Sequence, residues 1–428
     1  MDMPVAHIVT SVDGLAAVLK SSRAGFDVQR VPSQQAPDWR IEGGALQHRS
    51  GGFFSVNGFK DRTGESVLLF QPQAAVTGVL MARVKGEPVF LLQARAEPGC
   101  LGEAQFGPTV QSTPANYLKL HGGAGTPHVD AFIRSKPNTH IVQDTSQLDL
   151  GKRYFFKTKR SILAEGVAGP TEPNFVWAGL DAIQNGVLRS AFFNIDLRSI
   201  LAVSPWTRLT LTPRSTSVRT SVDAPVRPDA LAEVLSLVSR GLHTAPTQCA
   251  LPSLSNWQQT EWGWSERTAR QGFSIDFFKV RAEFREVAEW VQPLVNSSNE
   301  GCAALACRER GGVIECFVRV EPEIGLSQSA ALVPSYLRYP GDGGEEPDWL
   351  TDDRAVTWSE TTESDEGGRF FCDASRYVIC RVDESAQPID EDGVWLRLSE
   401  LKFLLAMSNV CSIQLRGLVS QFLGVQDI

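Results

Sequence analysis

The residue types that transfer protons and bind polar ligands are concentrated between residues 93 and 123. A general base requires a carboxylate or an imidazole, and a proton donor or oxyanion ligand requires a hydroxyl, ammonium or amide group. These groups lie among glycines and prolines as Glu97, Gln111, Asn116, Tyr117, Lys119 and His121. The stretch is therefore a candidate site for acid–base chemistry, and a polar surface loop is the alternative that its composition leaves open.

The segments that must position this loop have strand and helix patterns. Residues 79–84 and 89–94 are apolar and rich in strand formers around a short Lys-Gly-Glu turn, which predicts a hairpin directly before the loop. Asp196 lies near an expected helix start. Further strands are expected at 154–156 and 161–164, and helices within 177–190 and 194–203. The predicted fold class is α+β.

The same order of patterns returns in the second half of the chain, which indicates an internal duplication. The motif Glu97-Pro98 is repeated as Glu321-Pro322. A constant separation of 218 positions joins three further pairs: Trp177 and Trp395, Leu197 and Leu415, and Arg198 and Arg416.

The duplication predicts two tandem units joined by a helical linker. We expect the first unit over residues 1–206, the linker over 207–263 and the second unit over 264–428. Within the linker, apolar residues at helical spacing after Pro228 predict a bridging helix over 228–242.

The two units differ in the residues that could do chemistry. All six histidines precede residue 264, and the second half has no recognisable counterpart of segment 38–58 (DWRIEGGALQHRSGGFFSVNG). The loop after the hairpin is also shorter in the second half. A catalytic pocket is therefore expected in the first unit, with a degenerate second unit.

Composition argues against several classes of partner. The chain has 428 residues and a net charge of −8, which disfavours nucleic acid and anionic membrane surfaces. No stretch reaches the ~20 apolar residues that span a bilayer, and the expected location is cytoplasmic. The eight cysteines form no CxxC pair, so we expect buried free thiols and no metal site.

The loop resembles the signature of the NDP-hexose 2,3-dehydratase family. That signature is close to QAxxEPGxxxxxQxxPTVQxTxxNYxxxHGG, and the chain reads QARAEPGCLGEAQFGPTVQSTPANYLKLHGG from Gln93. Segments 38–58, 153–165 and 174–183 also resemble the family. The resemblance covers most of residues 25–206 and is weaker in the second unit.

The resemblance implies two Nudix-like domains and a nucleotide-linked 4-keto-6-deoxyhexose as substrate, typically on dTDP. The C4 ketone would acidify the C3 hydrogen, and loss of the C2 hydroxyl would give a 3,4-diketo-2,6-dideoxy sugar. No hydride moves and the chain has no GxGxxG motif, so no cofactor is expected. A homodimer and a downstream NADPH-dependent ketoreductase are the expected partners.

This chemistry suggests roles for individual residues. Glu97 or His121 is expected to be the base, and Tyr117 to donate a proton or stabilise the enolate. Phe54 is expected to stack on the nucleobase, with Phe53 and Trp39 as alternatives. The other expected substrate ligands are Gln93, Gln111, Thr113, Asn116 and Lys119, of which Gln111 and Asn116 suit sugar hydroxyls. Lys157, Lys159, Arg160 and Arg198 are the candidates for the diphosphate. The repeat of Arg198 as Arg416 leaves an architectural role open for that pair.

Two other functions are alternatives to a dehydratase. A Nudix hydrolase requires a helix with several carboxylates in the pattern REUxEExGU, but the nearest match, from Arg285, has Trp290 and Gln292 where a Glu and the Gly should stand. A hard cation would lack its oxygen ligands there. A non-catalytic nucleotide-sugar binder or scaffold is the other alternative, and the nearly complete signature argues against it.

Overall fold

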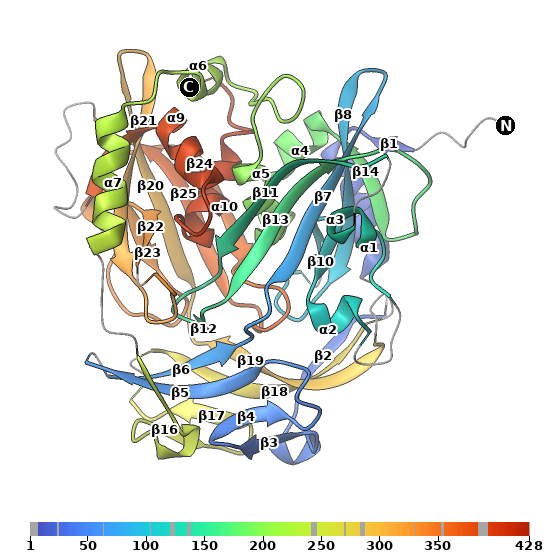
Figure 1. Cartoon of the computed structure of the whole chain (residues 1–428), viewed down its shortest axis with the longest axis vertical. Coiled ribbons are helices and arrows are strands. Elements are labelled where there is room, and N and C mark those ends of the chain that lie inside the picture. Colours follow the sequence, from blue (N-terminus) through green and yellow to red (C-terminus); the bar gives the residue numbers. More distant parts are fainter. Residues whose placement is uncertain are drawn as a thin grey trace.

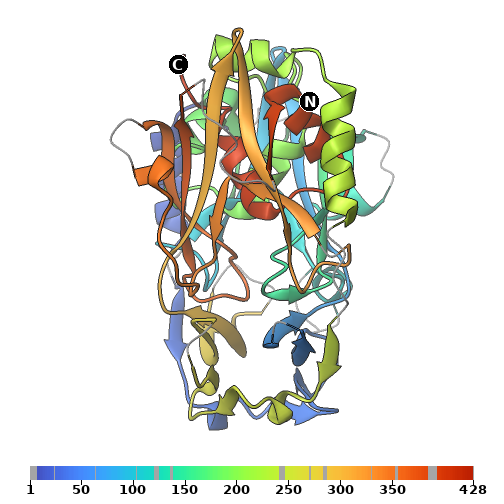
Figure 2. The ribbon, with the colours of Figure 1, turned by 90° about the vertical axis from the view of Figure 1, so that its left-hand side faces the viewer.

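The computed structural model of the chain shows two units side by side, each with a large sheet above a smaller one (Figures 1 and 2). It describes residues 7–23, 25–62, 64–102, 104–119, 125–134, 138–240, 246–268, 271–282, 287–328, 330–351, 355–383 and 393–427. Both units mix α and β structure, and buried apolar side chains from both form one continuous core.

The large sheet of the first unit has eight strands in mixed orientation, with β1-β14-β8-β7-β13-β11 as its main path. The predicted hairpin is confirmed as β7 and β8, which turn at Lys85 and Gly86 with positive φ angles of 54° and 89°. The strands of this large sheet are β1 (Ile8–Val9), β7 (Ala75–Val84), β8 (Glu87–Ala96), β9 (Ala104–Gly107), β10 (Val110–Ser112), β11 (His140–Leu148), β13 (Thr158–Glu165) and β14 (Phe175–Gly179).

The large sheet of the second unit repeats this plan with seven strands, along the path β22-β21-β20-β25-β24. The pairing of β13 with β7 is parallel, and so is the corresponding pairing of β25 with β20. Its strands are β20 (Gly301–Arg310), β21 (Val313–Pro322), β22 (Ala330–Pro334), β23 (Tyr336–Arg338), β24 (Val356–Ser364), β25 (Ala374–Arg381) and β26 (Gly393–Arg397).

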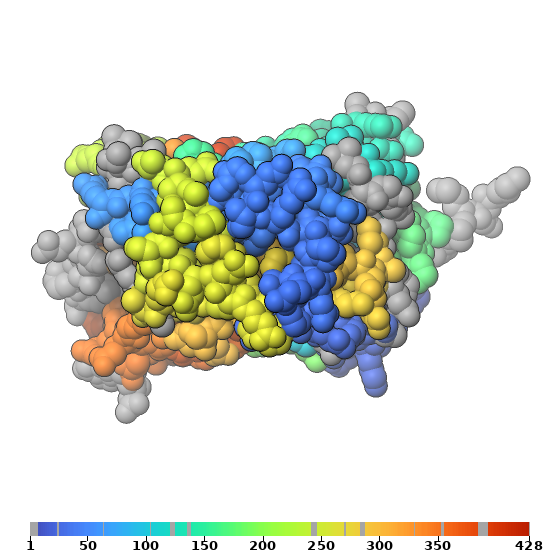
Figure 3. Space-filling model, turned by 90° about the horizontal axis from the view of Figure 1, so that it is seen from below, coloured from blue at the N-terminus to red at the C-terminus, as the bar shows by residue number. Residues whose placement is uncertain are grey.

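Two small sheets lie below the large ones, one for each unit. The first contains β3 (Trp39–Glu42), β4 (Ala45–His48), β5 (Ser55–Asp61), β6 (Gly64–Phe70), β12 (Tyr154–Phe155) and β15 (Thr247–Cys249). The second contains β2 (Asp27–Arg30), β16 (Trp257–Gln259), β17 (Gly263–Glu266), β18 (Phe273–Arg281) and β19 (Glu289–Ser297). From below, blue segments of the first unit and yellow-green segments of the second lie side by side (Figure 3).

The small sheets exchange one strand each. β2 lies early in the first unit but pairs with β18 of the second, and β15 precedes the second unit but pairs with β5 of the first. Each exchanged strand is followed by a short 3-10 turn, η1 (Ser33–Gln35) or η2 (Leu251–Ser253). The exchange ties the two units together through main-chain hydrogen bonds.

Two fully buried helices, α5 and α10, pack against each other between the large sheets. The side chains of Asn194 and Ser412 cap them by accepting from the Leu197 and Leu415 amides at 3.0 and 3.2 Å. The helices are α1 (Val12–Ser22), α2 (Pro114–Tyr117), α3 (Asp130–Ile133), α4 (Leu180–Gly186), α5 (Ile195–Val203), α6 (Thr216–Val222), α7 (Pro228–Arg240), α8 (Asp348–Thr351), α9 (Leu398–Ala406) and α10 (Ile413–Gln421). None of the described helices is long and apolar enough to cross a membrane.

The structure confirms the repeat and corrects its details. The expected helix is present as α7, packed on β21, β22 and β26 much as α1 packs on β8, β9 and β14. The domain boundaries that we expected stay a prediction. Segment 38–58 does have a counterpart, because β16–β18 pair as β3–β5 do, with Trp257 opposite Glu266 as Trp39 is opposite His48. The pairing is conserved although most of its residues differ.

The hairpin register also corrects the counterpart of Glu97. Glu97 follows the first residue of β8 by ten positions, and Glu323 follows the first residue of β21 by ten. The side-chain hydroxyl of Thr109 accepts from the backbone amide of Leu80 at 2.8 Å. The hydroxyl of Ser335 accepts from the backbone amide of Ala306 at the same distance. Glu323 therefore corresponds to Glu97, and the expected match of the Glu-Pro pairs is two residues out of register.

The cysteines are free, as predicted, but not all of them are buried. Six are buried, Cys249 is partly buried and Cys372 is exposed.

Candidate active site

A cavity of about 370 Å³ lies at the junction of the two units, under the end of the hairpin. The first unit contributes its small sheet and the signature loop, and the second contributes β19 and the turn after β24. Its lining residues are Trp39, His48, Ser50, Phe53, Phe54, Glu97, Pro98, Asn116, Val287, Trp290, Val291, Gln292, Gly368 and Arg369. The pocket is thus shared by both units, whereas the sequence led us to expect it within the first.

Glu97 is the acidic side chain of the cavity wall, and β8 holds it in place. It is 3% exposed, and its Oε1 accepts from Arg95 Nη2 at 2.9 Å. Arg95 and Glu97 share one face of the extended chain because side chains alternate along it. Arg95 Nη1 in turn donates to Gln93 Oε1 at 2.7 Å. The result is an oriented carboxylate at the edge of the cavity.

The second unit supplies the cation of the cavity wall. Arg369 Nη1 donates to Gln292 Oε1 at 3.2 Å, and its guanidinium lies 4.5 Å from the ring centroid of Phe54. Gln292 Nε2 donates to the carbonyl of Gly368 at 2.9 Å, which ties β19 to this turn. The Gly368 amide donates to Glu366 Oε2 at 2.8 Å. These contacts fix the backbone from which Arg369 projects.

The opposite part of the cavity is aromatic. Trp39 and Phe54 have ring centroids 5.0 Å apart, and His48 makes edge contacts with Trp39 at 5.5 Å and Phe53 at 4.8 Å. Burial lowers the pKa of His48, although the nearby Asp38 acts in the other direction. His48 Nδ1 lies 2.8 Å from Ser50 Oγ and 3.3 Å from the Ser50 amide nitrogen. An imidazole N–H and several flat apolar faces are groups that fit a nucleobase.

The corresponding region around Glu323 contains buried side chains of both units. Tyr339 stands four residues after Ser335, as Thr113 does after Thr109, and its hydroxyl donates to Glu323 Oε1 at 2.7 Å. The Arg153 guanidinium lies against the rings of Tyr339 and Phe273, at 5.6 and 4.3 Å. A tyrosine in place of Thr113 thus occupies volume near the second carboxylate.

The structure brings together three of the predicted site residues: Glu97, Asn116 and Phe54 line the cavity, as do the alternatives Phe53 and Trp39. Gln93 orients Arg95 instead of facing the cavity. Gln111 Oε1 accepts from Asn194 Nδ2 at 2.9 Å. Thr113 precedes α2 as its N-cap residue.

The cations expected at the diphosphate lie elsewhere and have protein partners. Lys157 and Lys159 are buried, and each has its Nζ 3.2 Å from Asp149 Oδ2. Arg160 forms an exposed, two-pronged ion pair with Asp144. None of these cations is among the described residues that line the cavity.

Arg198 is fully buried and pairs with Glu363 Oε1 at 2.5 Å. It also donates to the Val187 carbonyl at 2.8 Å. Its repeat, Arg416, donates to the carbonyls of Cys411 and Leu148, both at 2.5 Å. Both arginines thus tie together backbone segments around α5 and α10, as the architectural alternative describes.

The remaining predicted residues lie near the loop that follows α2. Tyr117 is partly buried against the apolar cluster around Phe132 and is not among the described lining residues. Lys119 is exposed with a φ of 58°. His121 lies outside the described residues. The roles assigned to these three residues stay predictions.

The cavity residues that sequence reasoning missed include His48, Trp290, Gln292 and Arg369. A signal for Arg369 existed, since the sequence GGRFFCDAS repeats the pattern GKRYFFKTK of the first unit. We expected each pocket to lie within one repeat, so Arg369 was not a candidate for the first pocket. Trp290 and Gln292 depart from the pattern of the hydrolase helix, and both lie in the strand β19.

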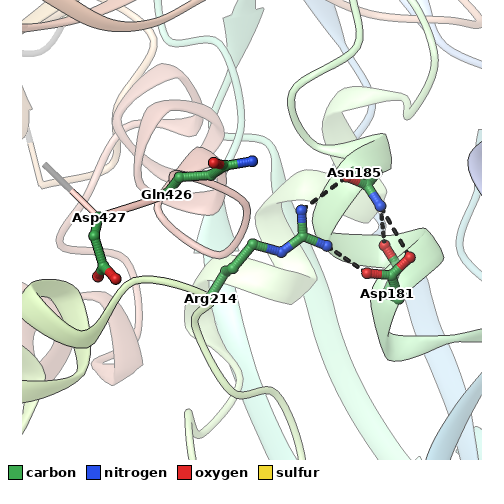
Figure 4. A pocket seen from close by; sticks show the side chains of 5 residues that line it. All are labelled: Asp181, Asn185, Arg214, Gln426 and Asp427. Carbon is green, nitrogen blue, oxygen red and sulfur yellow. Dashed lines mark hydrogen bonds and ion pairs between the residues drawn. The ribbon is translucent and has the colours of Figure 1, made fainter.

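A second cavity, of about 520 Å³, lies on the surface near the C-terminal end (Figure 4). Its polar groups bind one another, because Arg214 donates to Asn185 Oδ1 at 2.9 Å and to Asp181 Oδ1 at 2.5 Å. Asp427 Oδ1 accepts from the Thr216 amide at 2.6 Å. These contacts anchor the C-terminal segment. In the described part of the chain, no three His, Cys, Asp or Glu side chains are grouped to hold a metal ion.

Comparison with known proteins agrees with the two-unit architecture. The family model for NDP-hexose 2,3-dehydratase matches the chain twice, over residues 17–203 and 231–422. The chain belongs to this family. The two matches begin within α1 and α7 and end near α5 and α10, so each 2,3-dehydratase repeat corresponds to one structural unit.

Three relatives carry the name dTDP-4-dehydro-6-deoxy-alpha-D-glucopyranose 2,3-dehydratase. The protein from Saccharopolyspora spinosa is 26% identical, over 92% of this chain and 87% of its own length. The relative from Streptomyces violaceoruber is 27% identical, over 92% and 93%. The one from Amycolatopsis orientalis is 28% identical, over 92% and 86%.

Proposed function

We propose that the protein is a sugar-nucleotide 2,3-dehydratase that removes the C2 hydroxyl of a 4-keto-6-deoxyhexose linked to a nucleoside diphosphate, with dTDP as the nucleotide. The product is the 3,4-diketo-2,6-dideoxy sugar, so the enzyme is a carbon–oxygen lyase. One observation carries the proposal: two residues of the family signature, Glu97 and Asn116, line one cavity, and Arg95 orients the Glu97 carboxylate.

Glu97 is the proposed base. Its carboxylate removes the proton from C3, and the electron pair of that bond forms the C3–C4 double bond while the C4 oxygen becomes an enolate. Because Arg95 holds Oε1, the carboxylate does not have to be ordered during the reaction. Asn116 supplies a neutral N–H donor for a sugar oxygen.

The second half of the reaction expels the C2 hydroxyl. The enolate electrons return to form the C4 carbonyl, a C2–C3 double bond forms, and the hydroxyl leaves as water with a proton from an acid. The resulting enol takes up a proton at C2 and releases the proton of its C3 hydroxyl, which gives the diketone. Tyr117 and His121 stay the predicted donors, and the His48 imidazole is a further N–H group at the cavity.

The assembly and cellular context follow from the same proposal. Each unit has a Nudix-like fold, and the sequence lacks the carboxylate pattern of the magnesium-binding helix of the hydrolases. The protein works as a homodimer in the cytoplasm, and an NADPH-dependent ketoreductase consumes its reactive product. The fold, the homodimer and the ketoreductase rest on the resemblance described above.

Turnover of the proposed substrate tests the function. The protein is incubated with dTDP-4-keto-6-deoxyglucose, a ketoreductase and NADPH, and mass spectrometry follows the nucleotide sugar. We expect a product that has lost one water and gained two hydrogens, and none with the Glu97→Gln variant. Binding of dTDP without any loss of water would favour the scaffold alternative, and release of a nucleoside monophosphate would favour the hydrolase.

A further inference from the structure

Arg369 is the one Arg or Lys among the described residues that line the first cavity. It comes from the second unit, through the turn that follows β24. A nucleotide sugar brings two negative charges on its diphosphate into this cavity. Anions of this kind are bound by Arg, Lys and backbone N–H groups. Arg369 is therefore the cavity residue whose chemistry matches the diphosphate.

The guanidinium has hydrogen-bonding capacity to spare. Nη1 donates to Gln292 Oε1 and to the Gly368 carbonyl at 3.2 and 3.1 Å. Nε is buried and has no hydrogen-bond partner within the described ranges of the chain. Within the described residues no carboxylate forms an ion pair with the Arg369 guanidinium, and Glu366 accepts from the backbone amide of Arg369 instead. An anionic ligand would complete this site.

The counterpart at the second pocket is Arg153 of the first unit, which is more deeply buried than Arg369. Arg153 is 3% exposed, and its Nη2 donates to the Pro340 carbonyl at 2.6 Å. Both arginines lie over a phenylalanine, Phe273 for Arg153 and Phe54 for Arg369. The same position is thus used for packing in one repeat and faces a cavity in the other.

We propose that Arg369 binds the diphosphate of the substrate, so that the second unit completes the active site of the first; this inference rests on the proposed function. The placement agrees with the order of groups in a nucleotide sugar. On one side, Gly367 contacts Glu97, the proposed base for the hexose. On the other, the guanidinium lies on Phe54, next to the aromatic wall that fits the nucleobase.

Calorimetric binding of dTDP and of thymidine to the full-length protein tests the inference. Arg369→Gln should weaken dTDP binding by at least ~30-fold, because charge-assisted hydrogen bonds to two phosphates are lost. Thymidine has no phosphate, so its affinity should change by less than ~2-fold, which also shows that the pocket is intact. Arg369→Lys keeps the charge but not the planar, two-pronged donor geometry of the guanidinium, and we expect dTDP affinity to fall by about 5- to 10-fold.

Arg376→Gln is the matched control, because Arg376 is a second-unit arginine that pairs with Glu346 and does not line the cavity. Its dTDP affinity should equal that of the parent. Unchanged dTDP affinity in Arg369→Gln, with a fall in turnover alone, would overturn the diphosphate assignment in favour of enolate stabilisation. If Arg369→Gln does not fold, a dTDP affinity at the parent level in Arg369→Lys would overturn it equally. Failure of the parent protein to dehydrate the substrate would instead count against the proposed function, whatever the nucleotide affinities.

Discussion

Glu97 of the first unit and Gly367 of the second are in contact across the junction: a Cβ added to Gly367 would lie 2.3 Å from Glu97 Oε2. The relationship is reciprocal, since a Cβ on Gly151 would lie 2.4 Å from Glu323 Oε2. Each repeat therefore places its carboxylate against a glycine of the other. The main chains meet as well, with the Gly99 amide donating to the Gly367 carbonyl at 2.8 Å.

Gly367→Ala should disable the site without unfolding the protein. The new methyl group must displace the Glu97 carboxylate, which is the flexible end of a side chain, so the cost in stability should be about 1–2 kcal/mol. A base moved by about 1 Å should reduce turnover by ~10²-fold. Turnover and melting temperature, measured together, check this prediction.

Two glycines serve as controls for that variant. Gly343→Ala should change nothing, because no atom lies within 4 Å of the new methyl group. Gly151→Ala presses on Glu323 Oε2 and on Leu326 in the filled second pocket, so it should lower the melting temperature and leave most of the turnover. Similar losses of turnover in Gly151→Ala and Gly367→Ala would mean that the second carboxylate also takes part in the reaction.

Glu97→Gln separates proton abstraction from packing. Glutamine keeps the shape and can still accept from Arg95, so the nucleotide affinity and melting temperature should stay near those of the parent. Exchange of the C3 hydrogen with deuterated solvent should fall by at least ~10²-fold together with turnover, as expected when a general base is removed. Nuclear magnetic resonance of the sugar measures the exchange.

Glu323→Gln is the structurally matched control for Glu97→Gln, in preference to Glu321→Gln. Glu323 occupies the equivalent register and its partner is Tyr339, so the variant should retain exchange and turnover. Parent-level exchange in Glu97→Gln would exclude Glu97 as the base and make His121 the preferred candidate.

The sequence was sufficient for the local architecture of the site. Alternating apolar residues and a Lys-Gly turn predict β7 and β8, and the signature predicts that Glu97 and Asn116 are close to a ligand. The hairpin prediction succeeds because the pairing of adjacent strands depends on neighbours in sequence, whereas the closeness of Glu97 and Asn116 to a ligand stays a prediction. The repeat could be found because α5 and α10 keep the same buried arginine.

The contribution of the second unit could not be predicted in the same way. The exchange of β2 and β15 depends on pairings between strands more than 180 residues apart, and no local pattern records it. From the sequence alone, Arg369 is a copy of Arg153 in a degenerate repeat. The cavity beside Arg369 is visible only in the structure. The sequence suggested Lys157, Lys159 and Arg160 as diphosphate ligands. In the folded protein these side chains form ion pairs with Asp149 and Asp144.

Chelation should leave turnover unchanged. The C4 ketone of the substrate itself acidifies the C3 hydrogen, so the proposed reaction needs no Lewis acid at the sugar. The rate measured after dialysis against EDTA should match the untreated rate within ~2-fold, and added magnesium should not raise it. A loss on chelation that magnesium restores would show that the diphosphate or the enolate requires a cation in addition to Arg369.

The last prediction concerns a buried acid at the junction, Asp365, and the dependence of stability on pH. Burial, with a smaller contribution from Asp373, raises the pKa of Asp365 to about 7, although Ser375, Arg153 and Tyr377 oppose the shift. Ser375 Oγ donates to Asp365 Oδ2 at 3.0 Å. In the unfolded chain the pKa of an aspartate is about 3.9. The folded state therefore holds the proton more tightly, and this contribution to stability is complete below about pH 4 and is lost as the pH rises to about 7.

Asp365→Asn removes this pH dependence, because an amide does not ionise and can still accept from Ser375. Relative to the parent, the variant should gain on the order of 2 kcal/mol of stability between pH 5 and pH 8. Melting temperatures of both proteins at the two pH values measure the gain, with Asp229→Asn on the exposed side of α7 as the control. If the difference in stability between variant and parent were the same at pH 5 and pH 8, Asp365 would already be ionised in the folded protein at pH 5. That result would contradict the prediction.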